Sequence, residues 1–454
     1  MDYFQETKRD VPIVAKKDVV VAGGGPSGVM AAVAAARTGA STLLIEANGY
    51  MGGVATMGLP IQGYFDSKGA QIVKGLGQEF AQRLRAIGGA YPEFIQCKLH
   101  NPFLIIDNEM VKVVCQDMIE QACVEIYLHT RASGVLREGE KMKAIVVENK
   151  SGREAIAGKV FVDATGDGDI ACKCGLPFTS GRPDDGLTQS ATLNFRLDGV
   201  HTLTLIRCLF ENPERYDLFD IPREQFRTNR MHIMVGLKNL IDEARSDGFE
   251  GMPFGRVCYI THLAEGAVVI NMTHVRVQGQ DARDLTKAEL EARKQVPVVL
   301  EFLRRYVPGF EKARLTSTAN QIGIRETRQI TGDYTLTGKD VKEGKSFPDT
   351  IAVGGYPIDI HSPTAEDVEL FAVPAYGIPY RCLTPKGIDN LLVTGRCISA
   401  THQAMASARV MATCMAIGHA AGVAAALAAG ANGEVRDVKI DELRETLKEQ
   451  EAVL

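Results

Sequence analysis

A glycine-rich segment near the start of the chain constrains the fold more than any other feature. Residues 18–23 (Asp-Val-Val-Val-Ala-Gly) are a short β-branched run, which predicts a buried strand that ends at a glycine. Residues 24–28 (Gly-Gly-Pro-Ser-Gly) lead into a run of small residues at 29–38, which predicts a helix that ends at Gly39. A second buried strand is predicted over 42–46. The crossover in this β-α-β unit requires a parallel sheet.

The glycines of this segment fit the GxGxxG pattern of dinucleotide-binding sites. The first glycine allows a tight turn, the second lets the backbone approach a pyrophosphate, and the third lets the helix pack closely on the strand. The pyrophosphate then lies at the N-terminus of the helix, where unpaired N–H groups and the helix dipole favour an anion. We therefore predict that a dinucleotide is bound here by Gly23, Gly25, Pro26, Ser27 and Gly28.

A carboxylate and a second glycine-rich loop follow the second predicted strand. Glu46 lies 18 residues after Gly28, which is about the spacing of an acid that binds ribose hydroxyls. Residues 47–56 (Ala-Asn-Gly-Tyr-Met-Gly-Gly-Val-Ala-Thr) then form the second loop, close to the ribose end of the predicted site. Domains that bind only a nicotinamide dinucleotide seldom carry such a loop, so the pattern favours FAD.

With these motifs the chain resembles the FAD-dependent oxidoreductases of the glutathione-reductase-like superfamily, in the broad fumarate reductase-like group. Members commonly carry a Gly-Gly pair shortly after the ribose acid. Residues 161–169, a hydrophobic strand that ends in Ala-Thr-Gly, resemble the second flavin-domain signature, and residues 390–395 resemble the third. The superfamily usually has an acid after the last glycine, whereas this chain has Arg396. The resemblance implies further FAD contacts from Gly52, Gly53, Val54, Thr165, Gly166, Asp167, Gly395 and Arg396.

The resemblance also bears on the flavin ring and on its attachment. A long helix is predicted over 407–429, and its first residue, Ser407, would lie near the pyrimidine edge of the flavin. The dipole of that helix would stabilise an anionic reduced flavin. Succinate dehydrogenase-like members attach the flavin through a histidine in the loop after the ribose acid. This chain has no histidine before His100, so we expect non-covalent FAD.

Several charged side chains are candidates for the chemistry on the substrate. Arg325 and Arg328 lie on a strand-like segment, and Arg409 follows the predicted flavin loop; a guanidinium fork suits a carboxylate or another oxyanion. His361 precedes a turn and is a candidate proton donor or acceptor. The alternatives are a structural ion pair for each arginine and a structural role for His361. Further candidates with weaker support are Tyr356, Tyr376, Tyr380 and His402.

The order of predicted elements indicates an α/β fold with two domains. A Rossmann-like FAD-binding domain is predicted from 15–190 and 368–454, and an inserted mixed α+β substrate domain from 191–367. The insert contains no second GxGxxG, so a dedicated NAD(P)H domain is not expected. Further predicted elements are a helix over 109–125, strands over 126–130, 144–148, 159–162, 192–197, 256–260 and 268–274, and helices over 230–246 and 286–306.

Charge and cysteine spacing argue against several functional classes. A net charge of −5 and a pI of about 6.1 make a nucleic-acid-binding surface unexpected. The ten cysteines include no CxxC pair, so we predict no metal centre. Buried thiols and an N-terminus unlike a signal peptide lead us to expect a cytoplasmic protein. The apolar stretch 411–429 contains His419 and is predicted to be a core helix rather than a membrane span.

These observations predict an enzyme that transfers a hydride between FAD and a small carboxylate- or oxyanion-bearing molecule. Three alternatives remain open at this point. The chain could be a flavin-carrying electron-relay subunit of a larger complex, an NAD(P)-binding dehydrogenase, or a lyase or isomerase that uses FAD without net electron turnover. The electron partner could be the substrate itself, a small carrier or another protein, and a homo-oligomer is compatible with the sequence.

Overall fold

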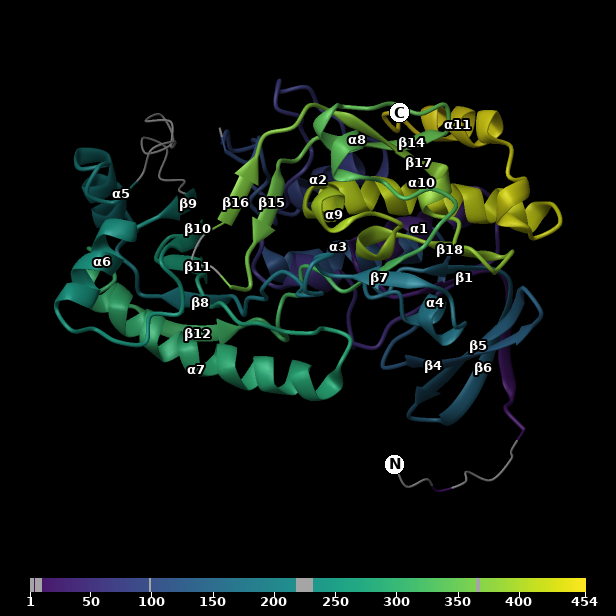
Figure 1. Ribbon diagram of the computed structural model, residues 1–454, viewed down its shortest axis with the longest axis horizontal. Coiled ribbons are helices and arrows are strands. Elements are labelled where there is room, and N and C mark those ends of the chain that lie inside the picture. Colours follow the sequence, from purple (N-terminus) through teal and green to yellow (C-terminus); the bar gives the residue numbers. More distant parts are fainter. Residues whose placement is uncertain (1–3, 5–9, 98, 218–231, 365–367) are drawn as a thin grey trace.

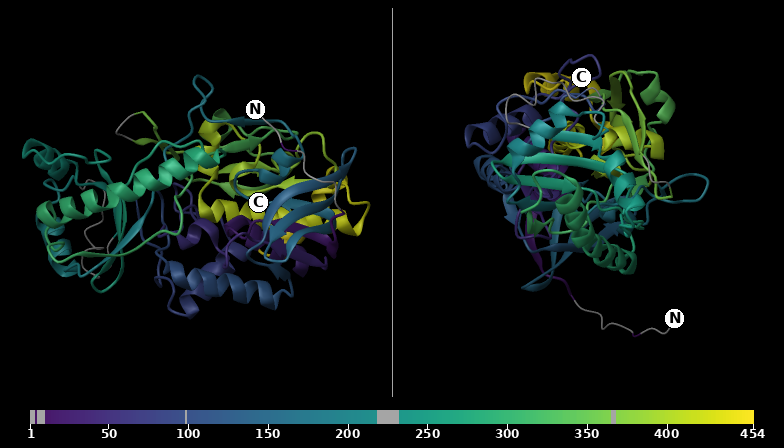
Figure 2. Two further views of the ribbon diagram at one scale, coloured as in Figure 1. Left: turned by 90° about the horizontal axis from the view of Figure 1, so that it is seen from below. Right: turned by 90° about the vertical axis from the view of Figure 1, so that its left-hand side faces the viewer.

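A computed structural model describes residues 4, 10–97, 99–217, 232–364 and 368–454, and the statements below refer to those residues. The fold is mixed α/β, as predicted, with two sheets that each support a core of their own. Figure 1 shows the two parts side by side, with the C-terminal helices beside the larger sheet and the smaller sheet at the left. Figure 2 shows the same division from two further sides.

The larger sheet is built around the predicted β-α-β unit. Strand β1 (Ile13–Ala22) pairs in parallel with β2 (Thr42–Ile45) and with β6 (Gly152–Asp163). Strand β3 (Glu125–Tyr127) continues the parallel order beyond β2, and β18 (Leu391–Val393) pairs in parallel with β6. The predicted strands over 18–23 and 42–46 are therefore confirmed. Segments from both halves of the chain end at one edge of this sheet.

Helices cover one face of the parallel strands. Helix α1 (Pro26–Arg37) is the predicted crossover, and it packs on α10 (Met411–Gly430). The backbones approach closely because Gly418 and Gly422 of α10 lie against the carbonyl oxygens of Ser27 and Ala31, where a Cβ would not fit. The other helices of this part are α2 (Leu76–Ala86), α3 (Asn108–Gln121), α4 (Asp169–Lys173), α9 (His402–Ala408) and α11 (Ile440–Glu449).

An antiparallel hairpin extends the other side of the larger sheet. Strands β4 (Arg131–Glu138) and β5 (Lys141–Asn149) pair with each other, and β5 pairs with β6. The predicted strands over 144–148 and 159–162 are the inner parts of β5 and β6. Strand β4 was not predicted, because none of its residues is fully buried and an irregularity after Ala132 breaks the alternation of its apolar residues.

The second sheet is antiparallel throughout, in the order β12-β8-β11-β10-β9. Its core includes side chains of α7 (Ala282–Tyr306), which Figure 1 shows alongside it. The strands are β8 (Phe195–Asp198), β9 (His232–Gly236), β10 (Val257–Ala264), β11 (Ala267–Asn271) and β12 (Arg314–Thr318), and the two shorter helices are α5 (Thr202–Glu211) and α6 (Lys238–Ser246).

Two of the predicted helices are wrong in extent. The prediction over 230–246 covers β9 and α6, and its first two residues lie outside the described residues. Pairing of β9 with β10 overrides the helical preference there. The predicted helix over 407–429 is two helices, α9 and α10, separated at Arg409 and Val410. Val410 has extended backbone, with φ −68° and ψ 150°, and it is the N-cap of α10.

The chain between the second sheet and β18 packs mainly with the larger core. Leu336, Ile351 and Ile358 belong to that core, although they fall within the predicted insert 191–367. The predicted domain boundaries stay a prediction, and this packing differs from them at the C-terminal end of the insert. The elements here are β13 (Arg328–Ile330), α8 (Gly338–Lys342), β14 (Thr350–Gly354), β15 (Ile358–His361), β16 (Val368–Phe371) and β17 (Tyr376–Pro379). Strand β13 pairs with β7 (Phe178–Ser180), which precedes the second sheet in the sequence.

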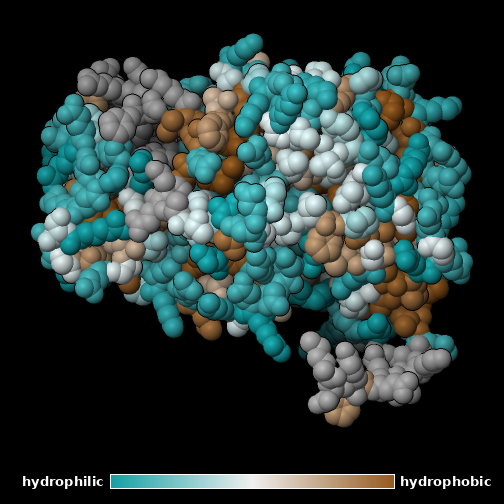
Figure 3. Space-filling view, in the orientation of Figure 1, coloured by the Kyte–Doolittle hydropathy of each residue, from teal (hydrophilic) through white to brown (hydrophobic). Residues whose placement is uncertain are grey.

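Helix α10 is long and apolar enough to cross a membrane by length and composition. In the fold, 89% of its most apolar window is buried, against α1 and the sheet. The prediction that 411–429 is a core helix is therefore confirmed. On the face that Figure 3 shows, hydrophobic residues form separate patches among hydrophilic ones.

Candidate active site

The carboxyl ends of the parallel strands bring four of the predicted motifs together. Gly23 follows β1 and donates its N–H to the carbonyl of Ile45 at the end of β2 (2.8 Å). Ala164, after β6, donates to Ala22 of β1 (2.9 Å), and Thr394, after β18, donates to Asp163 of β6 (3.0 Å). Ligands of open α/β sheets bind at this edge. The structure therefore places the predicted FAD motifs in one location, although they are up to about 370 residues apart in the sequence.

The glycine turn before α1 has the shape that a pyrophosphate requires. Gly23 has φ +101°, and a side chain there would meet the backbone of Ala164. Gly28 lies against the carbonyl of Gly23, which also leaves no room for a Cβ. Gly25 is different, because a Cβ built there would meet no described atom within 4 Å. Gly25 is the N-cap of α1 and no side chain caps the helix, so its first N–H groups face open space that an anion can fill.

Glu46 links the two glycine-rich loops through hydrogen bonds to its carboxylate. Its buried carboxylate accepts hydrogen bonds from the N–H of Gly24 (2.7 Å) and from the N–H and side-chain amide of Asn48 (2.7 and 2.9 Å). A carboxylate offers about four acceptor positions, so capacity remains for a ribose hydroxyl. Gly52 donates to the carbonyl of Gly24 (2.8 Å), and Gly53 lies against the Cα of Gly25. The second loop is thus packed on the first.

The turn after β6 is organised by a buried carboxylate that the sequence analysis did not single out. Asp163 is fully buried and accepts hydrogen bonds from the Thr165 hydroxyl (2.6 Å) and the N–H of Ala171 (2.9 Å). Burial raises the pKa of Asp163 to about 6, despite these hydrogen bonds. Gly166 then turns with φ +80° and brings Asp167 to the strand end.

Arg396 forms an ion pair where the superfamily pattern has an acid. Its Nη2 atom lies 2.9 Å from Oδ1 of Asp167, which also accepts from the hydroxyl of Thr327 (2.8 Å). The Nη1 atom of Arg396 is buried and has no partner among the described residues. Arg396 also lines a cavity, which is described below. A carboxylate is therefore present beside this turn, but it belongs to Asp167 and not to the residue that follows Gly395. The unpartnered Nη1 fits an anionic or carbonyl group of a bound cofactor.

Ser407 does not begin a helix. It lies in the last turn of α9, and its hydroxyl is used within the protein, bonded to the hydroxyl of Tyr376 (2.7 Å) and to the carbonyl of Tyr356 (2.5 Å). The helix N-terminus that opens on the cavity is that of α10, where Val410 and Met411 line the wall. The dipole argument made for Ser407 therefore applies to the start of α10.

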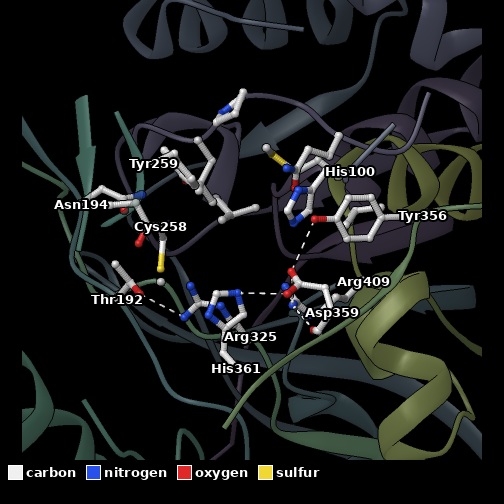
Figure 4. A pocket seen from close by; sticks show the side chains of 18 of the residues that line it. His100, Thr192, Asn194, Cys258, Tyr259, Arg325, Tyr356, Asp359, His361 and Arg409 are labelled. Atoms are coloured by element: carbon white, nitrogen blue, oxygen red, sulfur yellow. Dashed lines mark hydrogen bonds and ion pairs between the residues drawn. The ribbon is translucent and has the colours of Figure 1, made fainter. Parts of the chain in front are cut away.

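A cavity lies between the carboxyl ends of the parallel strands, where the predicted FAD motifs meet, and the second sheet. Figure 4 shows side chains that face it. Asn194, Cys258 and Tyr259 reach it from the second sheet, while His100 and Tyr356 lie across from them. The predicted FAD contacts Val54 and Arg396 line it as well. Among the predicted catalytic residues, those that line the cavity are His361, Arg325 and Arg409.

The other two arginines of the cavity, Arg325 and Arg409, differ in their partners, because Arg325 bonds only to neutral oxygens whereas Arg409 also contacts a carboxylate. Arg325 donates from Nη1 to the carbonyl of Ser190 (2.6 Å) and to the hydroxyl of Thr192 (3.0 Å). Burial, together with the nearby charge of Arg409, lowers the pKa of Arg325. Arg409 donates to the carbonyl of Asp359 (2.9 Å) and lies 3.3 Å from its carboxylate. The Nε of Arg409 is buried without a partner in the described structure.

Asp359 and His361 form a buried pair on β15. The imidazole Nε2 lies 3.3 Å from Oδ1 of Asp359, and both residues are more than nine-tenths buried. Burial and the charge of Arg325 lower the pKa of His361 to about 4, so the ring is neutral near pH 7. Burial opposes ionisation of Asp359, but His361 and Arg409 hold its pKa below the ordinary value. The Nδ1 atom of His361 is buried and has no described partner.

Except for Tyr356, the remaining candidates lie outside the cavity lining. Arg328 pairs with Asp169 (3.0 Å) and donates to the carbonyl of Asp167 (3.0 Å), which is the structural alternative considered for it. His402 contacts the buried carboxylate of Glu326 through Nδ1 (2.8 Å). Tyr376 and Tyr380 are bonded within the fold, to Ser407 and to the carbonyl of Val435. Tyr356 alone among the three predicted tyrosines lines the cavity.

Sequence reasoning missed polar residues that only the tertiary structure brings to the cavity. His100 is 4% exposed, burial lowers its pKa, and its Nδ1 has no partner among the described residues. It lies between two isolated β-bridges and belongs to no motif. Asn194 and Asn271 stand at strand ends of the second sheet. Asn271 carried a weak signal, because a polar residue ends an otherwise apolar run, Ala267–Asn271.

Comparisons with known proteins show the family of the chain and its fold. The family model described as "FAD dependent oxidoreductase" matches residues 18–447. A search of curated proteins gives no significant match. Among solved structures, a geranylgeranyl bacteriochlorophyll reductase-like protein from Thermoplasma acidophilum is similar, with 14% identity, a TM-score of 0.50, and coverage of 96% of this chain and 84% of that chain. This likeness shows the fold.

Two further solved structures are similar at lower scores. The flavin-dependent brominase Bmp2 has 12% identity and a TM-score of 0.48, and the match covers 96% of this chain and 83% of that one. The p-nitrophenol 4-monooxygenase PnpA from Pseudomonas putida has 14% identity and a TM-score of 0.41, over 95% of this chain and 84% of that one.

Proposed function

The chain belongs to the FAD-dependent oxidoreductase family, and we propose that it oxidises or reduces a small carboxylate- or oxyanion-bearing molecule in the cavity between its two sheets. FAD, when bound, supplies the capacity to accept or donate a hydride. The residues that fit it are the glycine turn with its open N-terminal space, Glu46, the Gly52–Val54 loop, and Arg396 with its unpartnered Nη1. These surround the strand edge that adjoins the cavity.

One observation carries the choice of substrate class. Among the described residues, the cavity lining contains three arginines, Arg325, Arg396 and Arg409, and one carboxylate, that of Asp359. Arg396 is paired with Asp167 outside the lining and Arg409 with Asp359, so Arg325 keeps only neutral partners in the described structure. A partly buried guanidinium without a counter-charge carries a cost in free energy. A bound oxyanion removes that cost and accepts the charge-assisted hydrogen bonds that a guanidinium offers.

The chain's own residues then have distinct roles. Arg325 and Arg409 bind and orient the anionic group. His361 handles the proton, because a neutral imidazole whose Nε2 faces Asp359 leaves the Nδ1 lone pair as an acceptor. Asp359 orients that ring and balances one positive charge. His361 and Asp359 are buried, and the low exposure of this pair strengthens their electrostatic interactions.

The other readings receive less support. A relay subunit does not require an enclosed cavity with unpaired hydrogen-bonding groups, and an NAD(P)-binding dehydrogenase does not require the flavin-type turns after β6 and β18. A lyase or isomerase reaction would use the same residues but would cause no net change in the redox state of the flavin. A measurement of that redox state therefore distinguishes it from an oxidoreductase reaction. The fumarate reductase-like grouping, the non-covalent state of FAD, the electron partner, a homo-oligomer and a cytoplasmic location stay predictions.

We expect Glu46→Ala to weaken FAD binding by about 1–3 kcal/mol, the scale of a lost hydrogen bond to a charged group. The substitution removes both the ribose acceptor and the contacts that hold the second loop on the first. Fluorescence titration of the apoprotein with FAD measures the effect. Asn48→Ala is the matched control, since it loses the side-chain contact to Glu46 but keeps the carboxylate. An unchanged dissociation constant in Glu46→Ala would show that Glu46 does not bind FAD.

Arg325→Met tests the substrate class. In the FAD-loaded protein, we expect acetate and butanoate to perturb the flavin absorption spectrum, with dissociation constants at least about tenfold weaker in Arg325→Met than in wild type. Arg328→Met is the control, because Arg328 has its own ion pair and does not line the cavity. Equal affinities in Arg325→Met and wild type, or an equal loss in Arg328→Met, would contradict the proposal.

A further inference from the structure

Three polar side chains form a row across the second sheet. Tyr259 of β10 lies opposite Asn271 of β11 in the antiparallel register, and Ile270 lies opposite Phe195 of β8. Extending that register by one residue sets Asn194 opposite Asn271. Directly opposite residues of an antiparallel pair point to the same face of a sheet. Asn194, Asn271 and Tyr259 therefore stand side by side, and all three line the cavity.

The row is buried, and its two asparagines keep unused acceptor capacity beside Tyr259, whose hydroxyl interacts with both of their side chains. Asn194, Asn271 and Tyr259 are 4%, 2% and 5% exposed. The side-chain amide of Asn194 donates to the carbonyl of Met57 (2.9 Å), which fixes its orientation and leaves Oδ1 without a partner. Oδ1 of Asn271 is also buried and unpartnered among the described residues. Buried polar atoms nearly always have partners, so two such acceptors in one cavity indicate a ligand that donates hydrogen bonds.

The two sides of the cavity therefore have complementary requirements. The side formed by Arg325 and Arg409 offers donors and positive charge, and the asparagine row offers acceptors. Figure 4 shows Asn194 and Tyr259 on the second sheet, apart from Arg409 and Asp359. A neutral hydroxyl suits the row better than an ammonium group, because no carboxylate of the second sheet lines the cavity and the arginines already supply positive charge.

We propose that the row of Asn194, Asn271 and Tyr259 recognises a hydroxyl group of the substrate, which makes the substrate class a hydroxylated carboxylic acid. This inference rests on the proposed function for the position of the carboxylate. The O–H of that hydroxyl donates a hydrogen bond to an amide oxygen of the row, and the carboxylate lies at the arginines. The row is thus a specificity determinant contributed by the second sheet to a reaction site that the larger sheet builds.

The test compares acids that differ by one hydroxyl. The probes are butanoate with 4-hydroxybutanoate and hexanoate with 6-hydroxyhexanoate, each titrated into the FAD-loaded protein and followed by the flavin spectrum. We expect at least one hydroxy acid to bind wild type about tenfold more tightly than its partner. Asn271→Leu, which is close in size, should abolish that preference while leaving the affinity for the plain acids within about twofold. Thr261→Val is the control, a buried polar residue of β10 that does not line the cavity.

The outcomes separate this inference from the proposed function. If the plain acids bind and depend on Arg325, but neither hydroxy acid is preferred or the preference survives in Asn271→Leu, the hydroxyl site is wrong and the function stands. If none of the four acids binds, the proposed function fails, and this inference fails with it. A FAD content and a melting temperature equal to those of wild type establish that Asn271→Leu is folded. Asn271→Ser, which keeps an acceptor oxygen, should restore part of the preference.

Discussion

Gly25→Val should reduce the FAD content of the purified protein more than tenfold while the fold persists. Gly25 has φ −74°, which valine adopts without strain, and its Cβ would enter space with no described atom within 4 Å. That space lies at the uncapped N-terminus of α1, where the pyrophosphate is expected. The branched side chain would fill it and exclude the anion. Flavin absorbance per protein measures occupancy, and circular dichroism with a thermal melt measures the fold.

Gly430→Val is the matched control for that substitution. Among the described glycines, only Gly25 and Gly430 combine open space around a Cβ with a φ outside the left-handed region. Gly430 ends α10, away from the strand edge that holds the cofactor motifs. We expect its variant to keep normal FAD content. A Gly25→Val protein that folds and carries a full complement of FAD would show that this turn does not bind the pyrophosphate.

His361→Gln should lower turnover by about 10²–10⁴-fold, the usual contribution of a positioned acid or base. Glutamine keeps a polar side chain of similar length but cannot accept and release the proton. FAD content should stay normal, because in the described part of the chain the ion-pair contact of the His361 ring is with Asp359, which is not among the residues that fit the cofactor. His419→Gln is the control, since His419 is equally buried but is bonded to Gln450, and neither residue lines the cavity.

The pH dependence of the wild-type rate gives this prediction a second readout. His361 has a pKa of about 4, so its imidazole is neutral and able to accept a proton above that pH. Protonation removes the acceptor, and the rate should therefore fall as the pH is lowered through about 4. The variant should lack that limb of the profile. A variant that turns over as fast as wild type across the pH range would show that His361 does not transfer the proton and has a structural role.

The cofactor motifs could be predicted because their chemistry is local in sequence. Gly23, Gly25 and Gly28 belong to one turn, and the position of Glu46 follows from the length of one strand–helix–strand unit. Asp167 was also predicted as an FAD contact, but its ion pair could not be predicted in the same way. It pairs with Arg396, 229 residues away, and this contact exists only because β6 and β18 are neighbours in the sheet.

The arginines show how local geometry separates candidates that the sequence treats alike. Arg325 and Arg328 are three residues apart on an extended segment, and side chains alternate between faces along such a segment. Arg325 accordingly faces the cavity, whereas Arg328 faces Asp169. The alternation was available from the sequence once an extended segment was assumed. The proximity of Asn271 and Asn194 could not be predicted from the sequence, because it depends on the register of an antiparallel sheet whose strands are far apart in the chain.

The most direct test of the central claim is an anaerobic reaction of the FAD-loaded protein with paired acids and methyl esters. Each of 4-hydroxybutanoate, 6-hydroxyhexanoate and the corresponding plain acids is mixed with the oxidised and with the reduced protein, and the visible flavin bands are followed. We predict that at least one acid changes the redox state of the flavin, and that its methyl ester, which lacks the anion, does so at least about a hundredfold more slowly. Esters that react as fast as their acids would contradict an oxidoreductase built around an oxyanion site.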